Sequence, residues 1–158
     1  MPWSNPALSP GTLLPKAVAR RELLLKYPFD EKLIMSEDQQ FSRDLIRAGW
    51  SVVYRPASVV IHSHNYTLKS VFKRYFDSVY SLSQIFPAHG VAMSAGMGLR
   101  YVSREIRYIA RLFPLYLPYY FFYTGAKTAG TLASHAAGHM PRWMLRRLSL
   151  HSYHWKQC

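Results

Sequence analysis

The sequence contains a single cysteine, Cys158, at its last position. One cysteine can form no disulfide within the chain and can supply no cysteine-based zinc cluster, so stabilisation by either kind of cross-link is excluded. Near the N-terminus no positively charged start is followed by an apolar core, so no secretory signal is expected. Both absences fit a reducing compartment, and we expect a cytoplasmic location.

Acidic residues are scarce, and they nearly vanish from the second half of the chain. Residues 1–68 hold eight Lys/Arg and six Asp/Glu, whereas residues 69–158 hold twelve and two. The formal charge of +12 predicts an anionic partner, which could be nucleic acid, a phosphate-bearing small molecule or a membrane surface. Because 49% of the 158 residues are hydrophobic, the chain can bury one core, and a disordered chain is excluded.

The sequence also lacks a hydrophobic run long enough to span a bilayer. The uncharged stretch "LFPLYLPYYFFYTGA" (112–126) is interrupted by Pro114 and Pro118. It is shorter than the roughly 20 apolar residues that a spanning helix needs, so we do not expect it to cross a membrane alone. Its aromatic residues can form a core or, beside basic helices, an interfacial membrane contact, and both interpretations stay open.

The helical segments are marked by the spacing of apolar residues. Prolines crowd residues 1–15, which we expect to be a loop or a disordered start. Apolar residues at helical spacing predict a helix from Thr67 to Phe86, ended by Pro87, and another over about 99–111, after a glycine-rich joint at 90–98. A last amphipathic segment is expected to begin at Pro141.

One stretch carries residues typical of catalytic chemistry, "IMSEDQQFSRDLIRAGWSVVYRPASVVIHSH" (34–64). Ser36 is predicted to cap a helix, with Gln39 as its capping-box partner, and Gly49 to end it in a left-handed conformation. Glu37 and Asp38 would lie in the first turn, where the helix dipole favours negative charge. The residues after Gly49 are rich in β-formers and predict a broken strand that ends in His62 and His64.

This order of motifs resembles part of a known enzyme family. The segment "YPFDEKLIMSEDQQFSRDLIRAGWSVVYRPASVVIHSHNYTLKSVFKRYFDS" is similar to the C-terminal half of the catalytic domain of family-two, nucleotide-sugar-dependent glycosyltransferases. The bacterial rhamnosyltransferase-like enzymes of surface polysaccharide synthesis are the most similar group. The resemblance implies an α/β fold, namely the C-terminal part of a GT-A (Rossmann-like) domain over residues 16–86. A basic, aromatic-rich helical extension would follow over residues 87–158, so that the chain is mainly helical by residue count.

The resemblance also implies roles for individual residues. Asp38 would be the catalytic base of an inverting sugar transfer from a nucleotide diphosphate to a saccharide or lipid-linked acceptor, and Glu37 would orient the acceptor. His62, with His64 as the second choice, would help to hold a divalent metal, Mg or Mn, under the departing diphosphate. From spacing alone, an acidic pair that only complements the helix dipole and a histidine pair that binds no metal are the more frequent outcomes.

The sequence departs from the family in its first part. No Asp-x-Asp motif for the metal and no preceding nucleotide-binding βαβ half are found, and the proline-rich start stands where a strand should be. We therefore expect a truncated enzyme, inactive as an isolated chain.

A different class of function rests on the basic second half. Arg100, Arg104, Arg107 and Arg111 recur on one side of a predicted helix. They form either a solvated face or a contact with anionic headgroups at the inner face of the cell membrane. The alternative function is thus a basic membrane-surface or nucleic-acid-binding module without catalysis. Nucleic acid is the less favoured partner, because no helix-turn-helix, zinc-finger or RNA-binding signature is found.

Overall fold

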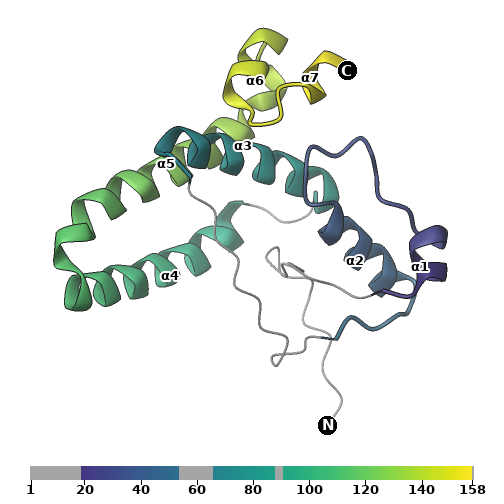
Figure 1. The fold of residues 1–158 in the computed structure, drawn as a ribbon, viewed down its shortest axis with the longest axis horizontal. Coiled ribbons are helices and arrows are strands. Elements are labelled where there is room, and N and C mark those ends of the chain that lie inside the picture. Colours follow the sequence, from purple (N-terminus) through teal and green to yellow (C-terminus); the bar gives the residue numbers. More distant parts are fainter. Residues whose placement is uncertain (1–18, 54–65, 88–90, 158) are drawn as a thin grey trace. The chain divides into compact units, whose positions relative to one another are not determined.

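The structure is a computed structural model that describes residues 19–53, 66–87 and 91–157, without the side chains of 91–98 and 157. The chain forms two compact units, Met1–His64 and Asn65–Cys158. Figure 1 shows that every regular element drawn in the described ranges is a helix. Trp50 to Val53 form no strand, and the rest of the predicted strand falls on 54–65, outside the described residues. The α/β fold class therefore stays a prediction.

The first unit contains helices α1 (Arg21–Lys26) and α2 (Glu37–Arg47). No residue of α1 is buried, whereas α2 buries Phe41 and Leu45 on one stripe. Helical spacing predicts Ala48 on the same stripe, but Ala48 is the C-cap and is exposed. Gly49 follows the C-cap with φ of 86°, the left-handed conformation that was expected to end the helix. The sequence thus predicted both the position and the end of α2.

The second unit begins with α3 (Leu68–Ile85), which confirms the helix expected over 67–86. The hydroxyl of Thr67 accepts a hydrogen bond from the backbone N–H of Ser70 and caps the helix. Val71, Phe76 and Ile85 are almost fully buried and form the core side of α3.

Helix α4 (Val91–Leu112) is longer than predicted, because the expected joint at 90–98 is helical from Val91 onward. That prediction was wrong: glycine weakens a helix by only about 1 kcal/mol, which neighbouring residues with strong helix propensity can offset. A short 3-10 turn, η1 (Pro114–Tyr116), connects α4 to α5 (Leu117–His135). Pro118 lies in the first turn of α5, where the missing backbone N–H costs nothing.

Helix α5 packs along α3, and this pair makes the core of the second unit. The two backbones approach closely at Gly130, where an added Cβ would lie 2.3 Å from the carbonyl oxygen of Phe72. None of the described helices is both long enough and apolar enough to span a membrane.

The chain ends with η2 (Ala137–His139), α6 (Arg142–Leu148) and α7 (His154–Gln157). A buried carboxylate fastens this end to α3, because Asp77 Oδ2 accepts hydrogen bonds from the backbone N–H groups of Leu150 (2.8 Å) and His151 (3.1 Å). Trp155 adds an edge-to-face contact with Tyr80, with ring centroids 5.0 Å apart. The last amphipathic segment is therefore a packed part of the unit.

Candidate functional site

The candidate catalytic carboxylates lie at the N-terminus of α2, directly after a residue with strained backbone. Ser36 has φ of 69°, and it is the one non-glycine residue with positive φ in the described ranges. Its side chain makes no capping hydrogen bond, so the predicted capping box with Gln39 is wrong. A left-handed residue at this position turns the chain sharply into the helix, and non-glycine residues held so cluster at functional sites.

The two carboxylates differ in their surroundings. Glu37 is exposed, whereas Asp38 is half-buried and its Oδ1 accepts a 2.9 Å hydrogen bond from the backbone N–H of Gln39. In the described part of the chain neither carboxylate forms an ion pair. The N-terminal end of α2 therefore presents an acidic pair in which Asp38 is oriented by the backbone and keeps one oxygen for another partner.

The loop before α2 is fastened to the helix by a polar and an aromatic contact. Gln40 is buried; its Oε1 accepts from the backbone N–H of Asp30 at 2.9 Å, and its Nε2 donates to Asp44 at 2.6 Å. The rings of Phe29 and Phe41 meet edge to face with centroids 5.5 Å apart. Phe41 is thus a core residue that holds the loop beside the acidic pair.

A metal site cannot be built from the residues that the structure describes. No group of three or more His, Cys, Asp or Glu side chains comes together in the described ranges to hold a metal ion. His62 and His64 lie outside those ranges, so the proposed metal ligands remain a prediction. Of the predicted catalytic and metal-binding residues, the described ranges contain Glu37 and Asp38, which lie together in the first turn of α2.

The four arginines of α4 lie in the second unit and are all exposed. The one acidic residue of α4, Glu105, accepts a 2.9 Å hydrogen bond from the hydroxyl of Tyr120. A hydrogen bond with Glu105 raises the pKa of Tyr101 to about 12, and burial, with Glu105 beside it, raises the pKa of Tyr120. Glu105 is therefore engaged with tyrosines.

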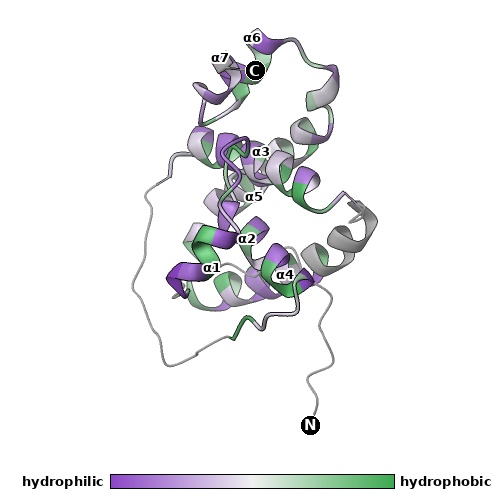
Figure 2. Ribbon diagram, turned by 90° about the vertical axis from the view of Figure 1, so that its right-hand side faces the viewer, coloured by the Kyte–Doolittle hydropathy of each residue, from purple (hydrophilic) through white to green (hydrophobic). Residues whose placement is uncertain are grey.

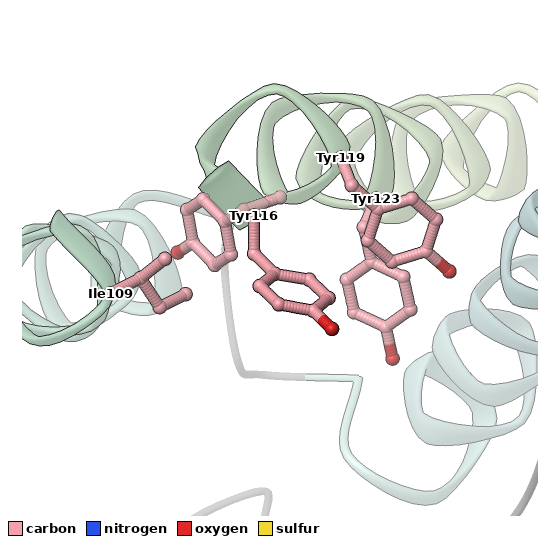
Figure 3. Close-up of a pocket in the computed structure, with 5 residues that line it drawn as sticks. Ile109, Tyr116, Tyr119 and Tyr123 are labelled. Atoms are coloured by element: carbon pink, nitrogen blue, oxygen red, sulfur yellow. The ribbon is translucent and has the colours of Figure 1, made fainter. Parts of the chain in front are cut away.

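An aromatic hollow of about 230 Å³ opens between α4 and α5. Figure 3 shows that Ile109 comes from α4 and that tyrosine side chains from η1 and α5 converge on the same space. The lining residues are Ile109, Tyr116, Tyr119, Tyr120 and Tyr123. The sequence indicated an aromatic cluster here, but helical spacing alone did not predict that its rings would surround an open hollow.

Sequence reasoning missed two polar anchors. Gln40 fastens the loop beside the acidic pair, and Asp77 fastens the C-terminal segment, although neither belongs to a motif. Asp77 lies on the side of α3 opposite the apolar stripe of Val71, Tyr75 and Val79, so helical spacing did not predict that it would be buried.

The chain is similar in sequence to two O-antigen chain rhamnosyltransferases. The chain is 31% identical over 128 residues to the O-antigen chain rhamnosyltransferase RfbN of Salmonella typhimurium (strain LT2). It is 30% identical over the same length to the O-antigen chain rhamnosyltransferase WbaN of Salmonella anatum. Each match covers 80% of this chain and 41% of the relative, so the match spans about two fifths of the relatives' length.

These matches support a relationship to glycosyltransferases, in agreement with the resemblance that the sequence suggested. No family model matches the chain. No solved structure matches it either.

Proposed function

We propose that these residues form part of a glycosyltransferase that transfers rhamnose from a nucleotide diphosphate to a saccharide acceptor with inversion. The similarity to two O-antigen chain rhamnosyltransferases over 128 residues is the observation that carries this proposal. The acidic pair at the N-terminus of α2 supports the proposal, because such a transfer needs a carboxylate that can receive a proton.

In this mechanism Asp38 is the general base. The acceptor hydroxyl oxygen attacks the anomeric carbon, the bond from that carbon to the diphosphate oxygen breaks, and the hydroxyl proton passes to the Asp38 carboxylate. The hydrogen bond from the backbone N–H of Gln39 leaves the second carboxylate oxygen of Asp38 available for this proton. Glu37, which is exposed one residue earlier, would hold the acceptor.

The N-terminus of α2 favours this assignment electrostatically. The partial positive charge of a helix N-terminus stabilises a carboxylate in its ionised form, which is the form that a base requires. The left-handed Ser36 and the loop anchored by Gln40 fix the direction in which the acidic pair points. A base held in this way loses little conformational entropy when the acceptor binds.

A divalent ion would neutralise the charge of the departing diphosphate when it is bound. In this proposal His62 and His64 are its candidate ligands. The nucleotide-sugar donor and the saccharide acceptor are likewise proposed partners.

The test uses the native polypeptide that contains these residues, isolated from its own cells with an antibody raised against residues 101–158. Rhamnosyl transfer from a nucleotide-diphosphate donor to a saccharide is measured for wild type and Asp38→Asn. Loss of a general base lowers kcat by about 10²–10⁴-fold, whereas donor binding should be nearly unchanged. The matched control is Glu31→Gln, which neutralises an exposed carboxylate in the same unit.

The outcomes separate two failures. Wild-type turnover in Asp38→Asn would refute the assignment of the base while leaving the reaction in place. Failure of the wild-type polypeptide to transfer sugar from any nucleotide-diphosphate hexose would reject the proposed function as a whole.

A further inference from the structure

A second hollow, of about 330 Å³, opens beside α6 in the second unit. Its lining residues are Trp143, Arg146, Arg147 and Ser152, and we call it the α6 hollow. All four residues are exposed, and Trp143 keeps 59% of its surface open to solvent. Sites for small molecules have volumes from about 300 Å³ upward, so the α6 hollow has room for one small ligand.

The sequence of α6 places three of these side chains on one side of the helix. At about 100° per residue, Trp143, Arg146 and Arg147 fall within an arc of about 100°. The buried Leu145 lies on the other side of α6, which packs against α3. Figure 2 shows hydrophilic and hydrophobic residues alternating along α6. The tryptophan and the two arginines therefore project away from the core of the unit.

The fourth lining residue, Ser152, follows a segment that the core holds in place. Asp77 Oδ2 accepts hydrogen bonds from the backbone N–H groups of the two residues before Ser152. Ser149 is fully buried, and its carbonyl oxygen accepts a 3.1 Å hydrogen bond from Lys73 Nζ. This wall of the α6 hollow is thus formed before any ligand binds, which lowers the entropy cost of binding.

The charge of the α6 hollow is positive. Within the described ranges neither of its arginines pairs with a carboxylate. Asp77 and Glu105, the two acidic side chains of residues 69–158, both accept hydrogen bonds from internal donors. The guanidinium group of Arg147 lies 5.9 Å from the ring centroid of Trp143, within the range of a cation–π contact. The α6 hollow therefore combines an exposed aromatic ring with two guanidinium groups that can bind an anion.

We propose that the α6 hollow binds a sugar phosphate. Guanidinium groups bind phosphate through charge-assisted, often bidentate hydrogen bonds. A phosphate monoester carries close to two negative charges at pH 7, which matches the charges of Arg146 and Arg147. The C–H groups on one face of a pyranose ring pack on the negative face of an indole ring, which Trp143 supplies. The hydroxyl of Ser152 can donate to or accept from a sugar hydroxyl.

The short distance between the charged and the aromatic group favours this class of ligand. Because Arg147 and Trp143 lie so close together, the anionic group and the ring of the ligand must be adjacent. In a sugar phosphate the phosphate is attached directly to the pyranose, whereas a ribose separates the base from the phosphate in a nucleotide. A carboxylated sugar would bring one negative charge to two arginines. A nucleic-acid strand stacks successive bases on several rings, and one aromatic residue lines the α6 hollow.

The test titrates the 158-residue chain, labelled with nitrogen-15, with glucose 1-phosphate and follows the backbone amide of Ser152 by NMR. We expect a saturable shift of this signal. Glucose 1-phosphate should bind at least about tenfold more tightly than inorganic phosphate or glucose, because each of these lacks one of the two contacts. The indole N–H signal of the buried Trp155 shows in every variant whether the core is intact.

Two variants separate the charged from the aromatic contact. Arg146→Gln/Arg147→Gln should weaken the binding of glucose 1-phosphate by about a hundredfold, because two charge-assisted contacts are lost. The matched control, Arg100→Gln/Arg104→Gln, removes the same charge from α4 and should bind like wild type at about 0.15 M salt, where exposed charges are screened. Trp143→Ala should keep the affinity for inorganic phosphate and bind glucose 1-phosphate no more tightly than that ion.

Several results would overturn the proposal. These are no shift of the Ser152 amide at millimolar glucose 1-phosphate, equal affinity of the wild type for glucose 1-phosphate and inorganic phosphate, or undiminished binding in Arg146→Gln/Arg147→Gln. Tighter binding of UMP, glucuronate or single-stranded DNA would assign the α6 hollow to a nucleotide, a carboxylated sugar or nucleic acid instead. None of these measurements requires sugar transfer, so this proposal and the proposed function can fail independently.

Discussion

Gly130 is the position where the structure makes its sharpest prediction about stability. A Cβ added there would lie 2.3 Å from the carbonyl oxygen of Phe72 and 3.2 Å from the backbone nitrogen of Phe76. Cβ atoms essentially never approach another atom within 3.0 Å, so α3 and α5 would have to separate by about 0.7 Å. Because the obstacle is backbone within a helix, no side-chain rotation can relieve the clash.

The cost follows from the contact that this separation would loosen. A radial gap of about 0.5–1 Å forfeits roughly a quarter to a half of the dispersion energy of the atoms that face each other. Overpacking of this kind typically costs about 1–3 kcal/mol. Replacing a helical glycine by alanine recovers up to about 1 kcal/mol of helix propensity, so the net loss for Gly130→Ala should be about 0–2 kcal/mol.

Gly125 in the same helix provides the matched control. A Cβ added at Gly125 meets nothing within 4 Å, so Gly125→Ala should raise the free energy of unfolding by about 0.5–1 kcal/mol. Thermal unfolding followed by circular dichroism should separate the two variants clearly, since 1 kcal/mol shifts Tm by about 4–8 °C in a domain of this size. If Gly130→Ala proved as stable as Gly125→Ala, the close contact between α3 and α5 would be wrong.

Two further predictions concern the buried polar anchors. Burial raises the pKa of Asp77 despite opposing hydrogen bonds from Ser149, His151 and Leu150. The contribution of the Asp77 carboxyl group to stability is therefore fully present below its pKa in the unfolded state. This contribution is lost as the pH rises through its pKa in the folded state. In urea titrations, the free energy of unfolding of Asp77→Asn should rise relative to that of the wild type between pH 4 and pH 7. A constant difference between the two proteins would contradict this. Asp77→Ala should lose about 1–3 kcal/mol at pH 4. Gln40→Ala should cost about 1 kcal/mol and speed hydrogen exchange at the Asp30 amide; unchanged exchange would count against the anchor.

The helices could be predicted from the sequence where the spacing of apolar residues and the residues that start or end a helix indicate the same bounds. The helix expected over 67–86 is α3, and Gly49 ends α2 in the expected conformation. The spacing of apolar residues reports which side of a helix is buried, and this information is local. The glycine-rich start of α4 is helical although its glycines predicted a joint. The helix propensity of the residues between the glycines offsets the effect of the glycines.

The cap of α2 shows where local rules fail. Ser36 followed by Gln39 satisfies the capping-box pattern, yet Ser36 is left-handed and makes no capping bond. The loop before α2 is fixed by Asp30 on Gln40 and by Phe29 on Phe41, and these contacts decide how the chain enters the helix. A contact across ten residues overrides a preference that extends over three, and no pattern within the motif reports it.

The candidate site was predictable only in part for a similar reason. The sequence predicted Glu37 and Asp38 at a helix N-terminus, and the structure confirms this position. The α4 arginines are exposed, as both interpretations of the sequence require, so the choice between a solvated face and a contact with headgroups stays open. Their separation from Glu105 was not predictable, because it depends on the hydroxyl of Tyr120, which another helix supplies.

Positive charge dominates the second unit, and its few carboxylates do not neutralise it. Asp77 and Glu105 are the only acidic side chains between residues 69 and 158, and both are engaged by internal donors. Several cations are also held by neutral groups, such as Lys73 on the carbonyl oxygen of Ser149 and Lys127 over tyrosine rings.

Within the described ranges Arg107 donates to the carbonyl oxygen of Ser103 at 3.2 Å, but no arginine of α4 pairs with a carboxylate, so their mutual repulsion opposes the folded state. Internal contacts therefore compensate part of the positive charge of the second unit and leave the row on α4 without a carboxylate partner in the described ranges.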